Sequence, residues 1–114
     1  VTMSYLGAER VLEGYNVMGV AKAALEAAMR YLAADLGREG IRVNAISAGA
    51  IRTLAAKGVP SFNQILHKIE ETSPLKRNTN QEEVADMTIV MLSQLSRGVT
   101  GETIYVDSGY HIMG

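Results

Sequence analysis

The feature that most constrains the fold is a long alanine-rich segment of helical periodicity that leads into a strand-like run. Within residues 16–36, apolar residues recur at steps of three or four, at Met18, Ala21, Leu25, Ala28, Leu32 and Leu36. This spacing predicts a long amphipathic helix, which Gly37 and Gly40 are expected to end. Residues 41–47 then predict a short strand. A helix that feeds a strand through a short turn is half of a βαβ unit.

Two further helices and a final strand are expected downstream. Ser61 is a candidate N-cap for a short helix that Pro74 ends. A third helix is expected to begin at Asn80, because Glu83 stands in the capping-box position. Residues 103–106 predict the last strand. This alternation indicates an α/β fold with a Rossmann-type, doubly wound parallel sheet.

The small number of strands bears on domain organisation. The chain opens with a strand-like segment, but the strands that the sequence predicts are too few to cover both faces of such a sheet. We therefore expect residues 1–114 to be the carboxyl-terminal part of a single Rossmann-type domain, with further strands upstream. We find no internal repeat and no interdomain linker.

Composition excludes several classes of function. The formal net charge of −1 indicates no nucleic-acid partner, and the lack of cysteine excludes disulfides, thiolate catalysis and zinc–thiolate sites. With no long apolar run and no leader-like start, we expect no membrane segment and a cytoplasmic protein. His67 and His111 have no evident partner cluster, so no metal site is expected and both are interpreted as surface or structural residues.

The pair Tyr15 and Lys22 is the main chemical signal. Six residues separate them, so on a helix both would project from one face, roughly 10 Å apart along the axis. A nearby ammonium favours the phenolate form and makes a phenol a better proton or hydrogen-bond donor. A reductase needs such a donor where negative charge develops on a carbonyl oxygen. Taken alone, the pair favours the simpler interpretation, an aromatic residue at a helix start and a solvated lysine.

A set of motifs in a fixed order resembles a known family. The motifs are Tyr5, Tyr15-x6-Lys22, the run 41–49, Ile51-Arg52-Thr53 and the closing segment 98–109. Together they resemble the bacterial NAD(P)H-dependent enoyl-acyl-carrier-protein reductases, divergent members of the short-chain dehydrogenase/reductase superfamily. The resemblance covers essentially all 114 residues and corresponds to the carboxyl-terminal half of that enzyme. Ordinary carbonyl-reducing members use Tyr-x3-Lys, whereas position 19 is glycine here, so the spacing favours reduction of C=C over C=O.

The resemblance implies three catalytic residues. Tyr15 matches the residue that hydrogen-bonds the thioester carbonyl of a trans-2-enoyl substrate, and Lys22 matches the lysine that holds the ribose hydroxyls of the nicotinamide cofactor. Tyr5 matches a second tyrosine of the site, for which the alternative is a core aromatic at a strand end. Tyr5 and Tyr15 would also bind substrate.

The resemblance further implies a cofactor loop and a substrate segment. The cofactor-binding residues would be Ile51, Arg52, Thr53, Leu54 and Ala55. The substrate-binding residues would be Ala55, Ala56, Val59 and Phe62. The alternatives are an ordinary strand-to-helix turn for the loop and the buried face of a helix for Phe62.

The function implied is reduction of a trans-2-enoyl thioester on acyl carrier protein by NADH or NADPH, in type II fatty acid synthesis. A homotetramer is implied as well, through the long helix and the last helix. Two alternatives stay open, a 3-oxoacyl-type carbonyl reductase and a non-catalytic oligomerisation fragment. The choice between NADH and NADPH also stays open, because the Gly-rich turn of the nucleotide site is absent from this chain.

Overall fold

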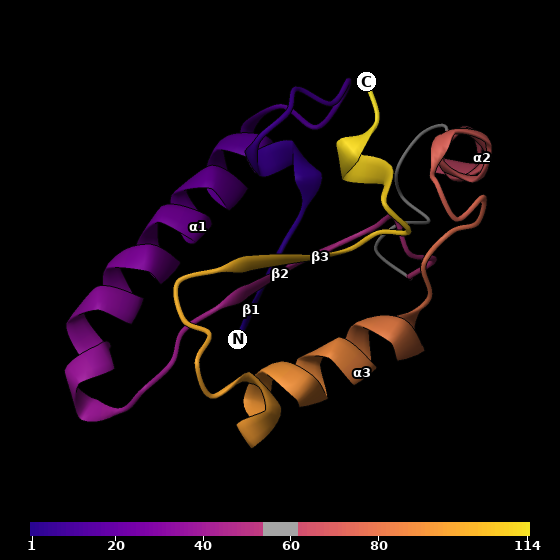
Figure 1. Cartoon of the computed structure of the whole chain (residues 1–114). Helices are drawn as coiled ribbons and strands as arrows, with labels where there is room; N and C mark the ends of the chain where they lie inside the picture. Colours follow the sequence, from indigo (N-terminus) through magenta and orange to yellow (C-terminus); the bar gives the residue numbers. More distant parts are fainter. Residues whose placement is uncertain (54–61) are drawn as a thin grey trace.

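Three parallel strands form the centre of the fold in the computed structural model, which describes residues 1–53 and 62–114 (Figure 1). They are β1 (Thr2–Ser4), β2 (Ala45–Ala48) and β3 (Thr103–Val106), hydrogen-bonded in the order β1-β2-β3. The strand-like start and the predicted strand at 103–106 are confirmed. The parallel sheet with helices on both faces confirms the doubly wound α/β class.

The register of the sheet defines its two faces. Ser4, Ser47 and Tyr105 lie in one row across the three strands, and the row before it contains Met3, Ile46 and Ile104. Side chains of successive residues point to opposite faces, so these two rows face opposite sides of the sheet.

Each face is covered by a different helix. Helix α1 (Val17–Leu36) lies between β1 and β2 in the chain, and its buried Glu26 accepts a hydrogen bond from Ser4. Helix α3 (Gln81–Leu92) packs Val84 and Met91 on Ile46, on the other face. Figure 1 shows α1 and α3 on opposite sides of the strands.

The two crossovers have opposite hands. The steps from β1 to β2 and from β2 to β3 run in the same direction across the sheet, but α1 and α3 lie on opposite faces. One crossover is therefore of the uncommon left-handed kind. Helix α2 (Phe62–Thr72) lies between β2 and α3 in the chain.

Helix α1 confirms the predicted helix but not its inward face. The buried residues are Glu26, Met29 and Ala33, whereas Met18 and Leu32 of the apolar pattern are about half exposed, at 49% and 48%. The predicted apolar stripe is therefore mostly on the outside of this chain. A carboxylate can take an inward position here because the Ser4 hydroxyl satisfies it.

Strand β2 is shorter than the predicted run 41–47. Arg42 donates hydrogen bonds to the carbonyls of Met91, Ser93 and Val99, at 2.9, 3.2 and 3.2 Å. Asn44 likewise donates to Val99, at 3.0 Å. These side-chain bonds tie the segment before β2 to the end of α3 and to the loop that follows it, and the strand itself begins at Ala45.

The predicted capping box of α3 is confirmed. The Glu83 amide donates to the Asn80 side chain at 2.9 Å, and the Asn80 amide donates to the Glu83 carboxylate at 3.0 Å. Helix α2 ends at Thr72, two residues before Pro74, as predicted, and its expected cap Ser61 lies outside the described residues.

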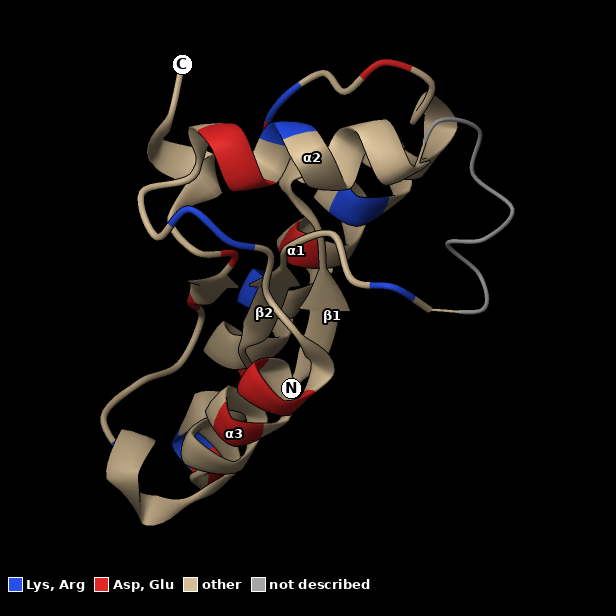
Figure 2. Cartoon of the chain, turned by 90° about the vertical axis from the view of Figure 1, so that its right-hand side faces the viewer, with Lys and Arg blue, Asp and Glu red and all other residues tan. Residues whose placement is uncertain are grey.

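Surface charge is mixed, and Figure 2 shows charges of both signs on α2. None of the described helices has the length and apolar character to cross a membrane.

Candidate functional site

The carboxyl ends of the three strands meet at one edge of the sheet. Tyr5 follows β1, Gly49 follows β2 and Asp107 follows β3. A Cβ built on Gly49 would lie 3.1 Å from the Asp107 Cα, a tight contact, so glycine at this position favours the close approach of these strand ends. A small pocket opens there, and its lining includes Tyr5, Leu6, Ala50, Ile69, Thr79 and Tyr110. Open α/β sheets bind ligands at this edge.

Tyr5 and Tyr15 are in direct ring contact. Their ring centroids are 5.1 Å apart and their planes are inclined by 69°, an edge-to-face arrangement. Tyr15 does not lie on a helix, because α1 begins at Val17 and Asn16 has a φ of 46°. The prediction that one helical face carries both Tyr15 and Lys22 is therefore wrong. The turn before α1 places the Tyr15 ring against Tyr5.

Both phenols are held in the neutral form. Burial raises the pKa of the Tyr15 phenol above its usual 10.0. Burial, followed by the neighbouring phenols of Tyr15 and Tyr110, also raises the pKa of Tyr5. The expected bias toward the Tyr15 phenolate does not appear, because burial disfavours the charged form. At neutral pH both groups are therefore O–H donors.

Lys22 is fixed to the first strand. It lies half-buried on α1, and its Nζ donates a hydrogen bond of 2.8 Å to the carbonyl of Met3, two residues before Tyr5. Of the three predicted catalytic residues, the structure joins Tyr5 and Tyr15 directly and connects Lys22 to them through β1.

The predicted cofactor loop leaves the carboxyl end of β2. Ile51 is half-buried and packs on the hydrophobic cluster between the sheet and α3, whereas Arg52 and Thr53 are exposed. The remaining predicted cofactor and substrate residues lie outside the described residues: Leu54, Ala55, Ala56 and Val59.

Phe62 is half-buried at the start of α2 and packs on a cluster of buried residues that contains Ala50, Leu66 and Ile69. Ala50 and Ile69 also line the pocket. Phe62 is thus part of the apolar wall behind the pocket, a position that suits both interpretations of this residue.

Asp107 organises the turn after β3. Its carboxylate accepts hydrogen bonds from the amides of Gly109 and His111, at 3.0 and 2.8 Å, and lies 3.0 Å from the His111 Nδ1. The His111 ring stacks on Tyr105, with centroids 3.8 Å apart. His111 therefore does have partners, contrary to the sequence interpretation, and its role is structural as expected. His67 is exposed, with its Nδ1 3.4 Å from Glu71.

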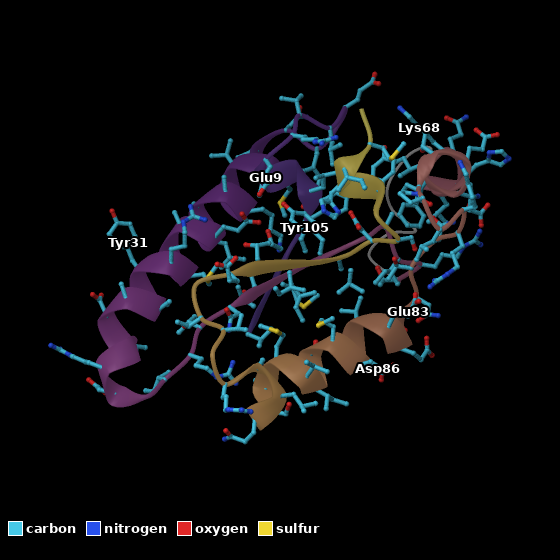
Figure 3. All side chains as sticks on the ribbon, in the orientation of Figure 1. Glu9, Tyr31, Lys68, Glu83, Asp86 and Tyr105 are labelled. Atoms are coloured by element: carbon cyan, nitrogen blue, oxygen red, sulfur yellow. The ribbon has the colours of Figure 1, made fainter. Side chains whose placement is uncertain are left out.

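Tyr105 extends this network toward α1 (Figure 3). Burial, followed by the hydrogen bond with the Glu9 carboxylate, raises the pKa of the Tyr105 phenol. The phenol is therefore neutral and links the sheet to the segment that precedes Tyr15.

Sequence reasoning missed Asp107 and Tyr110. Both line the pocket, and Tyr110 also contributes to the raised pKa of Tyr5. The Asp-Ser-Gly turn at 107–109 carried a usable signal, because it follows the last strand at the carboxyl edge, where ligands bind. Within residues 1–53 and 62–114, no group of three or more His, Asp or Glu is arranged to hold a metal ion.

Comparison with protein families gives a match over nearly the whole chain. The family model described as enoyl-(acyl carrier protein) reductase matches residues 1–111. The NADH-dependent enoyl-acyl-carrier-protein reductase FabI of Bacillus cereus is 67% identical over 114 residues, which is 100% of this chain and 44% of that protein. The NADPH-dependent FabI of Staphylococcus aureus is 63% identical over 111 residues, 97% of this chain and 43% of that protein.

Solved structures agree with this match. The crystal structure of the Bacillus cereus enoyl-acyl carrier protein reductase with NADP+ and indole naphthyridinone superposes with a TM-score of 0.97 at 67% identity. It covers 98% of this chain and 44% of that one. The reductase of Anaplasma phagocytophilum in complex with NAD has a TM-score of 0.90 at 53% identity, and it covers 98% of this chain and 40% of that one. The chain thus spans less than half the length of the relatives it matches.

Proposed function

The chain belongs to the enoyl-(acyl carrier protein) reductase family, and on this premise we propose that the full-length protein reduces the C=C bond of a trans-2-enoyl thioester carried by acyl carrier protein. The reductant would be NADH or NADPH, since relatives of both kinds match this chain. The observation that best supports this proposal is the contact between two neutral phenols beside a pocket at the carboxyl edge of the sheet.

Tyr15 is proposed to donate a hydrogen bond to the thioester carbonyl oxygen. Negative charge develops on this oxygen as the C=C bond is reduced, and a fixed donor aimed at it stabilises the enolate. A neutral phenol suits this role better than a phenolate, which has no proton to donate. Tyr5 contacts the Tyr15 ring edge-to-face and itself lines the pocket, so it can supply a second O–H donor.

The donor groups near this edge fit a dinucleotide. The Lys22 ammonium has three N–H donors, of which the Met3 carbonyl uses one, so it can also hold ribose hydroxyls. Arg52 and Thr53 bring a guanidinium and a hydroxyl to the loop after β2, and both suit phosphate oxygens. A bound nicotinamide supplies the hydride that the β-carbon of the substrate receives. Ile51 stays with these two as a proposed cofactor contact, as do Leu54 and Ala55.

The acyl chain is proposed to lie along the apolar residues that follow the cofactor loop. Ala55, Ala56, Val59 and Phe62 are the proposed contacts. Support comes from Phe62, whose cluster shares Ala50 and Ile69 with the pocket lining.

The direct test uses the full-length protein with a crotonyl thioester and NADH or NADPH. We expect cofactor oxidation, and a fall in kcat of roughly 100-fold or more in Tyr15→Phe, since one donor to a developing oxyanion contributes about 3 kcal/mol. Tyr31→Phe is the matched control, because Tyr31 lies on the outer face of α1, 75% exposed (Figure 3). Unchanged turnover in Tyr15→Phe would refute its assignment.

The same assay addresses the rival reaction. If a 3-oxoacyl thioester were reduced faster than the enoyl thioester, the protein would be a carbonyl reductase. Calorimetric titration of the isolated 114 residues with NADH tests the remaining alternative, a non-catalytic oligomerisation fragment. The absence of binding heat would favour this alternative.

A cytoplasmic homotetramer is proposed for the full-length protein. Support comes from large apolar residues on the outer faces of α1 and α3 and just beyond α3, among them Val20, Ile89, Leu92 and Leu95, all at least 66% exposed in this chain. Sedimentation of the full-length protein tests it, and a monomer would refute it.

A further inference from the structure

The Tyr15 ring packs tightly against the backbone at two glycines, Gly7 and Gly19. Gly7 lies in the short 3₁₀ turn η1 (Leu6–Ala8), and Gly19 lies in the first turn of α1. A Cβ built on Gly7 would lie 2.3 Å from Cδ1 and 2.5 Å from Cε1 of the Tyr15 ring. No real side-chain atom tolerates such distances, so the ring rests directly on the Gly7 backbone.

Gly19 makes a second close contact at the same place. A Cβ built on Gly19 would lie 2.7 Å from the Gly7 carbonyl oxygen and 3.6 Å from the Tyr15 Cδ1. The near atom at 2.7 Å belongs to the backbone, which cannot turn aside as a side chain does. Helix α1 and turn η1 therefore approach to backbone contact at the point where the Tyr15 ring is held.

We propose that Gly7 and Gly19 are positioning residues that set the place of the Tyr15 phenol against Tyr5. The same contact leaves no room for a lysine at position 19, four residues after Tyr15, so the amine comes from Lys22 in the next turn of α1. The proposal rests on the function proposed above for the role of Tyr15. The packing itself is independent of that function.

The two glycines act on the site and not simply on the core. Gly7 and Gly19 are both half-buried, and the atoms nearest to them belong to Tyr15 or to each other. An added methyl group at Gly7 would push the ring away from its 5.1 Å contact with Tyr5, and one at Gly19 would displace the Gly7 backbone on which the ring rests. A misplacement of about 1 Å in a catalytic group can lower a rate by roughly 100-fold.

Kinetics of the full-length enzyme provide the first test. We expect Gly7→Ala and Gly19→Ala to lower kcat for a crotonyl thioester by roughly 10- to 100-fold, with the KM for the cofactor within about twofold of the wild type. Gly37→Ala is the matched control at the other end of α1, because a Cβ there meets nothing within 4 Å. An equal loss of kcat in Gly37→Ala, or a rise in cofactor KM without a loss of kcat, would overturn the proposal.

A thermal double-mutant cycle provides a test that needs no activity. Because the predicted clash of Gly7→Ala is with the Tyr15 ring, its fall in Tm should largely disappear in a Tyr15→Ala background. The fall in Tm caused by Gly19→Ala should persist there, since its main clash is with the Gly7 backbone. Equal falls in Tm for Gly7→Ala in both backgrounds would contradict the proposed contact between Gly7 and the Tyr15 ring.

Fluorine NMR with fluorotyrosine separates this inference from the proposed function. The Tyr15 resonance, assigned by its loss in Tyr15→Phe, should shift in Gly7→Ala and Gly19→Ala and stay in place in Gly37→Ala. An unchanged Tyr15 resonance in both Gly7→Ala and Gly19→Ala would refute the proposal that these glycines set the position of the ring. If the wild type lacks enoyl reductase activity, the proposed function fails, whereas the cycle and the NMR shifts still decide the packing.

Discussion

Tyr15 lies so close to Tyr5 that a charge on one phenol opposes ionisation of the other. The contact of 5.1 Å between ring centroids is accompanied by a pKa of Tyr5 that burial raises first and the neighbouring Tyr15 raises further. The pair therefore behaves as one unit that keeps both protons well past neutral pH.

The first prediction concerns pH. A phenol with a raised pKa keeps its proton below its ordinary value of 10.0 and loses it only as pH rises through the higher folded value. We expect no loss of kcat/KM from Tyr5 or Tyr15 ionisation between neutral pH and pH 10, and a decline above it. The stability that the neutral Tyr5 and Tyr15 phenols contribute should likewise be complete below pH 10 and be lost as the pH rises through their folded pKa. Phenolate absorbance during a pH titration, compared with Tyr15→Phe, checks this. A fall in kcat/KM well below pH 10 that is present in the wild type and absent in Tyr15→Phe would contradict this prediction.

The second prediction concerns Asp107. Its removal leaves the amides of Gly109 and His111 without their acceptor. Each unsatisfied buried donor costs about 1–3 kcal/mol. We expect Asp107→Ala to lower Tm markedly and Asp107→Asn to lower it less, because an amide oxygen still accepts one bond. Asp86→Ala, at an exposed position on α3, is the control, and an equal loss there would remove the special role of Asp107 (Figure 3).

The third prediction concerns the start of α3. Asn80→Ala removes the side chain that accepts from the Glu83 amide, and such N-cap losses typically cost about 1 kcal/mol. Chemical denaturation of the full-length protein measures this loss. The neighbouring exposed residue supplies the comparison, since Gln81→Ala leaves the capping box intact and should change stability by less than about 0.5 kcal/mol.

The fourth prediction concerns Arg42. Its guanidinium binds the carbonyls of Met91 and Ser93 at the end of α3, as well as that of Val99. Arg42→Met keeps the aliphatic length but removes every one of these bonds, so we expect a loss of about 2 kcal/mol, typical of hydrogen bonds to a charged group. Arg38→Met, at an exposed position, should be close to neutral. A similar effect of the two substitutions would show that charge alone matters.

Local signals predicted much of the fold. The helix at 16–36 and the cap at Asn80 follow from periodicity and from a side-chain pattern within a few residues, and both are found. The inward face of α1 could not be predicted in this way. Glu26 is buried because Ser4, 22 positions earlier, satisfies it, and no local pattern encodes that partner.

The candidate site was predicted in part. Tyr5 and Tyr15 do meet, but not through a shared helix, because the left-handed backbone at Asn16 is invisible to a count of residues per turn. The raised pKa of Tyr15 also escaped prediction, since burial depends on the fold and not on sequence distance from Lys22. Asp107 and Tyr110 join the pocket only because β3 lies beside β2 in space.

The close contact between Gly7 and Gly19 also limits how this sequence can evolve. A single substitution that places lysine at position 19 meets the Gly7 carbonyl, at 2.7 Å from the first side-chain carbon. A lineage with this turn can therefore exchange one tyrosine–lysine spacing for the other only after the turn itself has changed.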